Sequence, residues 1–424
     1  MKKLILLITF LSFNFYLSAQ TISVAQNPEL VGMSSKKLSK IDREMKDWVA
    51  KGWMNGGGAI IIRKGKIAYH KAFGFNDLAS KEPLQKEAIY RIASQTKAIT
   101  SVAIMMLFED GKLLLDDPVS KYIPSFKKQN VLDKFNEKDT TFTTVPAAKE
   151  VTIRELLTHT SGLGYATIGS KEANAIYAKN KISSGLGEGN NSLLDAMSRL
   201  GTLPLMHQPG AKFTYGLNTD LLGCLVEVIS GENLEQFFKT RIFDPLGMKD
   251  TYFNLPAEKA NRLVNLYKEE KDGSLSKAIS GMLNTPVGPE YPLLKHSYFS
   301  GGAGLSSTLL DYATFLQMLL NNGKYNGNQL LSRNSVRIMT SNQIGDIPFG
   351  GDKFGLGFSI VTDKSSGKTL AQEGTFAWGG AFATSYWVDP QEKMVYLFYR
   401  QMLGSTHGDV VEKFRALTYQ AIAD

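Results

Sequence analysis

The chain has 424 residues, of which 43% are hydrophobic and 21% are charged, and its formal net charge is +8. This composition is ordinary for a globular protein and excludes a disordered or fibrous chain. The basic residues are scattered and form no stripe with interleaved aromatic residues, so we expect no nucleic-acid partner. The single cysteine excludes an intrachain disulfide and a zinc site built from cysteines, and the five histidines have no metal-ligand spacing, so we expect no metal or other cofactor.

The first 19 residues have the features of a signal peptide. Two lysines precede an apolar run over residues 4–17, and cleavage after Ala19 would leave a mature chain of residues 20–424. The run is shorter than the roughly 20 apolar residues that a membrane-spanning helix needs, and no later segment is apolar enough to span. We therefore expect an exported protein, periplasmic or secreted, with no integral membrane segment after cleavage. Its oligomeric state cannot be read from the sequence.

The mature chain begins and ends with strand patterns and has helical patterns between them. Apolar residues at helical spacing predict a helix over 35–50, and two apolar runs around Lys64-Gly65 predict a β-hairpin over 59–73. Helical patterns dominate from 94 to about 320, apart from two long polar loops over 127–149 and 164–191. Strands are predicted again over 355–361, 381–388 and 394–399, and a last helix begins near Gly408.

This order predicts an α+β fold with a single domain over residues 20–424. The terminal segments, about 30–90 and about 300–424, would share a mostly antiparallel sheet flanked by helices. Residues from about 91 to about 299 would form a helical subdomain packed against that sheet. A cleft between two such parts is a common place for a small-molecule site.

The segment from Ser94 to Lys97 is the strongest candidate for catalysis. It opens a long helical pattern, so the two side chains share one helix face a turn apart, as a serine nucleophile and its base require. The helix N-terminus and desolvation predict a lowered pKa for Lys97, which would let it accept the serine proton. The same Ser-x-x-Lys spacing recurs at Ser34, Ser125, Ser274 and Ser365, and we interpret these four copies as chance.

Other nucleophile arrangements are less well supported by the residues. No serine has glycine at both second flanking positions, so a Ser-His-Asp mechanism lacks its best sequence mark. His159 ends a helical pattern and is interpreted as a structural cap, and Cys224 lies in an apolar stretch typical of a buried small side chain.

Five segments resemble, in order, the motifs of the serine β-lactamase-related family, namely RIASQTK, LLTHTSGL, PGAKFTYGLNTDLLG, SGGAGLSST and AWGG. The resemblance extends from roughly Val31 to the last helix. The family includes class C β-lactamases, D-alanyl-D-alanine peptidases and family VIII carboxylesterases, and its β-lactamase/transpeptidase-like fold agrees with the fold predicted above. The resemblance implies an acyl-enzyme on Ser94, with Lys97 and Tyr215 as the acid–base pair.

Two departures from the β-lactamase pattern concern the substrate. The second motif, usually Tyr-x-Asn, reads Tyr215-Gly216-Leu217, and Leu217 cannot donate a hydrogen bond to a substrate amide. Asn218 is one residue late and would replace it only if the turn were shifted. The third motif, often Lys-Thr-Gly, reads Trp378-Gly379-Gly380, so a flat apolar wall replaces the cation that would bind a substrate carboxylate.

The Trp-Gly-Gly form resembles that of family VIII carboxylesterases and favours an uncharged ester. Gly379 and Gly380 would let the strand backbone approach closely, and the N–H groups of Ser94 and Ala381 are the candidate oxyanion hole. We therefore expect a serine esterase with a small-molecule ester as substrate. The alternatives are a lactam or peptide substrate, as in a β-lactamase or D-alanyl-D-alanine carboxypeptidase, an acyltransferase, and a non-catalytic binding protein on this fold.

Overall fold

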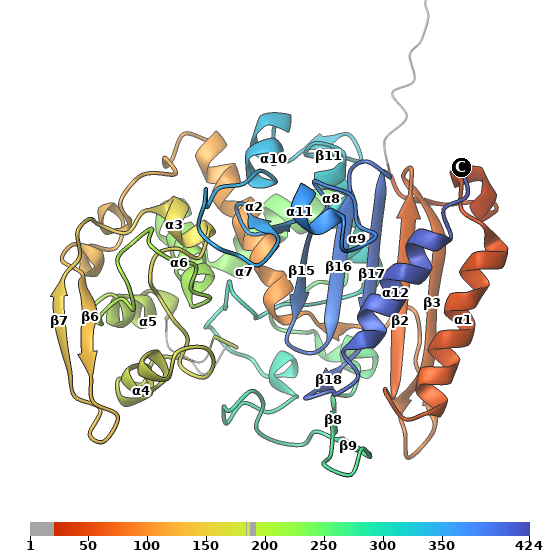
Figure 1. Cartoon of the computed structure of the whole chain (residues 1–424), viewed down its shortest axis with the longest axis horizontal. Helices are drawn as coiled ribbons and strands as arrows, with labels where there is room; N and C mark the ends of the chain where they lie inside the picture. Colours follow the sequence, from red (N-terminus) through yellow and green to blue (C-terminus); the bar gives the residue numbers. More distant parts are fainter. Residues whose placement is uncertain (1–20, 184, 187–191) are drawn as a thin grey trace, which may run out of the picture.

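The computed structural model describes residues 21–183, 185–186 and 192–424, so the predicted signal peptide lies outside the described residues. Among these residues, no helix is long and apolar enough to cross a membrane. The N-terminal and C-terminal segments form one sheet, and most of the helices between them lie to one side of it (Figure 1).

The sheet joins strands from the two ends of the chain. In the described residues it has nine strands in the order β1-β3-β2-β17-β16-β15-β14-β13, with β4 paired to β3, and every pair except β1–β3 is antiparallel. The predicted α+β class and the mostly antiparallel sheet are therefore confirmed. The bounds are β1 (Ser23–Val24), β2 (Gly56–Arg63), β3 (Lys66–Asp77), β4 (Glu82–Pro83), β13 (Lys353–Phe354), β14 (Ser359–Ile360), β15 (Phe376–Gly380), β16 (Thr384–Asp389) and β17 (Met394–Tyr399).

Helices cover both faces of this sheet. Alternate residues of a strand point to opposite faces, and in β17 the side chains of Val395 and Leu397 belong to the core shared with α2 (Thr96–Glu109) and α9 (Leu309–Leu320). Tyr396 and Phe398 instead pack with α1 (Ser35–Ala50) and α12 (Asp409–Gln420). All four side chains are fully buried, so β17 is a central strand of a three-layer arrangement.

Helices α3, α4 and α5 lie with α6 in the helical part, on the left of Figure 1. Twelve consecutive residues of α2, 96–107, are buried, as expected of a helix enclosed on all sides. The bounds are α3 (Ile153–Leu157), α4 (Lys171–Lys179), α5 (Leu193–Leu200), α6 (Asn218–Ser230), α7 (Leu234–Phe238), α8 (Asp244–Leu246), α10 (Arg333–Met339) and α11 (Asp363–Ser366). Short strands outside the main sheet are β5 (Tyr90–Arg91), β6 (Asn130–Phe135), β7 (Phe142–Pro146), β8 (Tyr267–Glu269), β9 (Leu275–Lys277), β10 (Ser306–Ser307), β11 (Lys324–Tyr325), β12 (Asn328–Gln329) and β18 (Met402–Leu403).

Four sequence predictions of local structure were wrong. The expected loop over 127–149 contains the β6–β7 hairpin, whose side chains are mostly exposed and so give no apolar alternation. The expected loop over 164–191 contains α4. Of the strand predicted over 355–361 only β14 forms, because residues 355–358 make a turn between β13 and β14 in which Gly357 adopts a φ of +94°. The strand predicted over 381–388 begins only at Thr384, since 381–383 form the turn that follows β15.

Candidate active site

Ser94 lies in a short 3-10 turn, Ala93–Gln95, that leads directly into α2. The preceding residue, Ala93, has a φ of +43°, a left-handed conformation that is uncommon for a residue with a side chain. Hydrogen bonds on both sides hold the turn in place. The Ile92 N–H donates to the Leu305 carbonyl at 3.1 Å, and the Tyr312 hydroxyl donates to the Gln95 carbonyl at 2.7 Å.

Lys97 is 2% exposed, and its ammonium group is fully engaged. Nζ donates to the Gly302 carbonyl at 2.8 Å, to the Tyr165 hydroxyl at 3.0 Å and to Ser94 Oγ at 3.3 Å. An ammonium has three N–H donors, and these three acceptors satisfy all of them. The structure therefore brings Ser94 and Lys97 together as predicted from their spacing.

The pKa predicted for Lys97 was wrong in direction. Burial by itself lowers the pKa of this amine, but its electrostatic interactions with the phenol oxygens of Tyr165 and Tyr215 outweigh burial, so the pKa is raised. The sequence prediction took account of burial and of the helix N-terminus, and it missed the two phenols. Lys97 is therefore an ammonium in the resting site.

Tyr215 stands over Lys97 and in contact with Trp378. The Lys97 Nζ is 4.7 Å from the centroid of the Tyr215 ring. The Trp378 indole N–H donates to the Tyr215 hydroxyl at 3.4 Å, and the two ring centroids are 5.6 Å apart. Trp378 thus borders the site through Tyr215, in an aromatic cluster with Phe349 and Phe354.

His159 lies behind Tyr215 rather than in the cavity. Its ring centroid is 4.8 Å from that of Tyr215, and its Nδ1 accepts a hydrogen bond from the Asn218 amide at 3.0 Å. Burial and the charge of Lys97 hold the pKa of His159 well below its usual value, so the imidazole is neutral. Asn218 is fully buried in this contact. The turn after Tyr215 is therefore not shifted, and Asn218 does not take the place of the asparagine of the β-lactamase motif.

Leu217 and the two glycines of the third motif were predicted to contact the substrate. Leu217 is fully buried in the core and does not line the cavity. Its N–H donates to the Gly164 carbonyl, and the residue is the N-cap of α6. Gly380 ends β15 directly against the nucleophile turn, where a Cβ atom would lie 2.3 Å from the Ile92 carbonyl oxygen. The residue there must be glycine for the strand to come this close, whereas Gly379 meets nothing nearer than 3.1 Å.

The two proposed oxyanion donors both border the same cavity. Ser94 is half-buried and Ala381 is exposed, and each lines the cavity. Apart from the regular hydrogen bonds of helices and strands, neither N–H group donates to a backbone carbonyl of residues 21–183, 185–186 or 192–424. Both are therefore available to a substrate oxygen.

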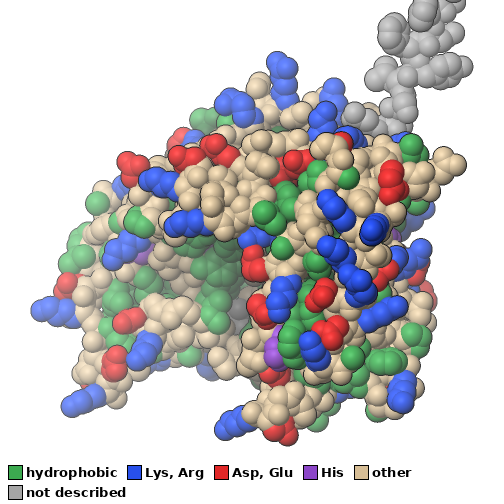
Figure 2. Space-filling view, turned by 45° about the vertical axis from the view of Figure 1, so that its right-hand side comes forward, with side chains coloured by type: hydrophobic (Ala, Val, Ile, Leu, Met, Phe, Trp, Pro, Cys, Tyr) green, Lys and Arg blue, Asp and Glu red, His purple; other side chains and the backbone are tan. Residues whose placement is uncertain are grey.

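The cavity at Ser94 is small, about 50 Å³. This space is enough for a few water molecules. Its lining comes from the helical part, from the segment 283–303 and from the turn after β15, and Figure 2 shows a hollow with hydrophobic side chains between the two parts of the molecule. The lining residues are Ala93, Ser94, Tyr165, Thr167, Ile168, Gly185, Leu186, Tyr215, Leu283, Thr285, Ala303 and Ala381.

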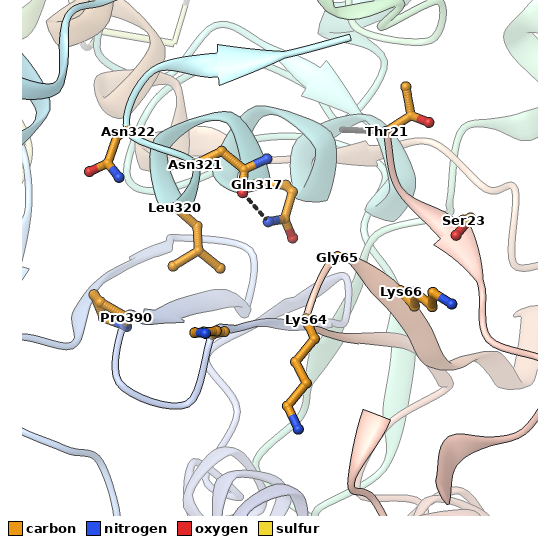
Figure 3. Close-up of a pocket in the computed structure, with 11 residues that line it drawn as sticks. Thr21, Ser23, Lys64, Gly65, Lys66, Gln317, Leu320, Asn321, Asn322 and Pro390 are labelled. Carbon is orange, nitrogen blue, oxygen red and sulfur yellow. Dashed lines mark hydrogen bonds between the residues drawn. The ribbon is translucent and has the colours of Figure 1, made fainter. Parts of the chain in front are cut away.

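A larger cavity, about 860 Å³, lies at the opposite end of the sheet. Figure 3 shows it between the turn at Lys64-Gly65, the turn at Pro390 and the end of α9 at Asn321. None of the predicted catalytic residues lines it. In the part of the chain that the structure describes, no group of three or more His, Cys, Asp or Glu side chains is placed to hold a metal ion.

Sequence reasoning missed two residues of the site. Tyr165 follows the LLTHTSGL segment, and nothing in its spacing indicated that its hydroxyl would contact Lys97. Asp220 is fully buried on α6, and burial raises its pKa to about 6. A carboxylate within the apolar stretch after the second motif was a signal that could have identified it.

The fold and the enclosed Ser94–Lys97 pair are those of a serine hydrolase. Residues 41–419 match the β-lactamase family, and the chain belongs to that family. It is 33% identical to protein Rv1367c of Mycobacterium tuberculosis over 82% of this chain and 86% of that protein. It is 29% identical to esterase EstB of Burkholderia gladioli over 79% of this chain and 82% of that protein. The solved structure of EstCE1, described as a hydrolase with promiscuous acyltransferase activity, superposes with a TM-score of 0.78 at 26% identity over 91% of this chain and 99% of that chain.

Proposed function

We propose that this protein is an exported carboxylesterase that forms an acyl-enzyme on Ser94. The observation that carries the proposal is that Ser94 and Tyr215 line one small cavity and both contact Lys97. Trp378, rather than a lysine, lies against Tyr215. An uncharged ester needs no cation for recognition, and the aromatic wall suits its apolar parts.

In acylation, Ser94 Oγ attacks the ester carbonyl carbon. Because Lys97 is already an ammonium, it cannot accept the serine proton. Tyr215 takes this proton on its phenolate oxygen and becomes a phenol, and the neighbouring Lys97 ammonium stabilises the phenolate form. The carbonyl oxygen becomes an oxyanion that the N–H groups of Ser94 and Ala381 receive, an interaction worth about 3 kcal/mol per donor.

The second half of the reaction reverses these proton movements. Tyr215 returns its proton to the leaving alcohol, and the acyl group stays on Ser94 as an ester. A water molecule then gives a proton to the Tyr215 phenolate and attacks the acyl carbon. Tyr215 passes that proton to Ser94 Oγ as the acid leaves, which restores the serine hydroxyl and the phenolate. With an alcohol in place of water, the same steps would transfer the acyl group.

The cavity size indicates a short acyl group. The cavity beside Ser94 is lined by Ile168, Leu186 and Leu283. Its volume is that of a few water molecules, which leaves room for an acyl chain of only about two to four carbons. The names of EstB, an esterase, and of EstCE1, a hydrolase, support ester hydrolysis as the reaction.

The experiment that tests this function compares p-nitrophenyl acetate, butyrate and decanoate with a chromogenic cephalosporin. We expect turnover of the short esters, little turnover of decanoate and of the cephalosporin, and loss of activity in Ser94→Ala. The matched control is Ser274→Ala, which changes the exposed serine of another Ser-x-x-Lys copy. Retained ester turnover in Ser94→Ala, or faster hydrolysis of the cephalosporin than of any ester, would contradict the proposal.

A further inference from the structure

A carboxyl group lies buried behind Lys97 and has no part in the mechanism above. Asp220 is 0% exposed on α6, and its Oδ2 has no hydrogen-bond partner among the described side chains. A Cβ atom at Gly302 would lie 2.3 Å from Asp220 Oδ2 and 3.5 Å from Lys97 Nζ. The carboxyl and the ammonium thus face the same glycine, whose carbonyl accepts the hydrogen bond from Lys97.

Lys97 needs a counter-charge that its direct contacts do not provide. Its three hydrogen-bond acceptors, Ser94, Tyr165 and Gly302, are hydroxyl and carbonyl oxygens. In the described part of the chain, no carboxylate lies within 4.0 Å of its Nζ. A buried charge without a counter-charge is strongly unfavourable, and Asp220 is the buried carboxyl whose charge interacts with Lys97.

Ser300 connects Asp220 to the wall of the cavity through hydrogen bonds that depend on whether Asp220 is protonated. Its Oγ lies 2.6 Å from Asp220 Oδ1 and 2.7 Å from the Gly185 carbonyl oxygen, but a serine hydroxyl has one proton. When Asp220 is ionised, that proton goes to the carboxylate. When Asp220 is neutral, its own proton can go to Ser300 Oγ, which then donates to Gly185. Gly185 lines the cavity, so the two protonation states bond the wall differently.

We propose that Asp220 is a positioning residue, whose buried carboxylate is the counter-charge that holds the Lys97 ammonium in place against Ser94 and Tyr165. This inference rests on the proposed function and deepens it. The ionisable groups that face the carboxyl are Lys97 from α2, Tyr165 from the loop after α3, and Tyr298 from the segment before Ser300, whose hydroxyl donates to Asp220 Oδ1 at 3.3 Å.

A role of this kind for Asp220 predicts that the esterase loses activity at acidic pH. Burial raises the pKa of Asp220 to about 6, so the carboxylate is present above that pH and is lost below it. We therefore expect kcat/KM for p-nitrophenyl acetate to fall as the pH decreases through about 6. The fall reflects loss of the counter-charge that holds the Lys97 ammonium in position, since the amine itself stays protonated below pH 6.

The test is the pH profile of kcat/KM for the full protein and three variants. Asparagine has the shape of the neutral acid, so Asp220→Asn should have, above neutral pH, about the activity that the unaltered protein has near pH 5. Its kcat/KM should show no step, that is, no change with pH near 6. Ser300→Ala removes a hydrogen bond that favours the carboxylate, so its step should move to higher pH. The control, Asp311→Asn, changes another buried aspartate whose pKa is also raised to about 6, and the step should stay in place.

Each outcome decides the proposal. An Asp220→Asn variant that loses activity by the same factor at every pH, with the step near 6 unchanged, would show a merely structural role and overturn it. Should Asp220→Asn fail to fold, the step in Ser300→Ala decides alone, and an unmoved step overturns the proposal. Failure of the esterase function itself is seen separately, as activity that survives Ser94→Ala.

Discussion

The two ends of the central strands differ in what they offer a ligand. One end, at the turn 381–383, abuts Ser94 and encloses a cavity of about 50 Å³. The other, at the turn between Pro390 and Lys393, opens on a cavity of about 860 Å³. The six residues of β16 separate the two turns by about 20 Å. None of the predicted catalytic residues lines the larger cavity, so the size of a cavity does not identify the reactive site in this fold.

The difference lies in how the polar groups are held. At the small cavity, the Lys97 ammonium and the Asp220 carboxyl are almost fully buried and fixed by short contacts. Charged groups are costly to bury without bonding partners, so the contacts that these two groups make specify their positions tightly. At the large cavity, Lys64 pairs with Asp424 while both side chains are more than 40% exposed, and a pair of this kind contributes little to stability.

The largest expected effect is a difference in kcat between variants at the small cavity and variants at the large cavity. Lys97→Ala and Tyr215→Phe should each lower kcat for p-nitrophenyl acetate by about 10²–10⁴-fold, because each removes a group that moves or stabilises a proton in the transition state. Lys66→Ala, at the large cavity, should leave kcat unchanged. A comparable loss in Lys66→Ala would remove the distinction between the two ends.

A smaller effect is expected where the strand meets the nucleophile turn. In Gly380→Ala the new methyl group would lie 2.3 Å from the Ile92 carbonyl, so the turn and the strand must separate. We expect a loss of about 1–3 kcal/mol of stability, as for other overpacked sites, together with lower kcat. Thermal unfolding and ester assays measure both. Gly367→Ala is the control, because it meets no atom within 4 Å, and equal behaviour of the two variants would refute the close approach.

Widening the small cavity should change the preferred chain length. Leu283→Ala removes three carbon atoms from the cavity lining, so p-nitrophenyl hexanoate should gain about tenfold in kcat/KM relative to acetate, the usual scale for a change of a few methylene groups. The control is Leu370→Ala, an exposed leucine away from the cavity. An unchanged ratio would place the acyl group elsewhere.

The smallest expected effect concerns the charge of the substrate. Trp378→Lys restores a cation next to Tyr215, so hydrolysis of carboxylate-bearing lactams should rise relative to hydrolysis of esters by about tenfold or less. Trp378→Phe keeps the aromatic wall and serves as the control. An ester-to-lactam rate ratio that is the same in both variants would remove the physical reason for preferring esters.

The sequence predicted the parts of the molecule that local patterns determine. The helix over 35–50 and the strand over 394–399 have the predicted bounds, since apolar residues recur there with clear periods. Exposed elements such as the β6–β7 hairpin have no such pattern and were missed. The Ser94–Lys97 contact followed from helix geometry alone.

The environment of these residues was not predictable from local patterns. The raised pKa of Lys97 depends on Tyr165, which is 68 residues away in the sequence and 3.0 Å away in the fold. The burial of Leu217 depends in the same way on how the second motif packs against Gly164. Tertiary contacts of this kind decide charge and orientation, whereas the motifs show only which residue types are present.

The measurement that tests the central claim most directly is the mass of the enzyme trapped during turnover of p-nitrophenyl acetate. Acetylation releases p-nitrophenol, a good leaving group, so the slower attack of water should let the acetyl group accumulate on the enzyme before rapid acid quenching. We predict an acetyl adduct on the peptide that contains Ser94, absent from the Ser94→Ala variant under the same conditions. An adduct on any other residue, or ester turnover with no covalent intermediate at any time point, would contradict the acyl-enzyme mechanism.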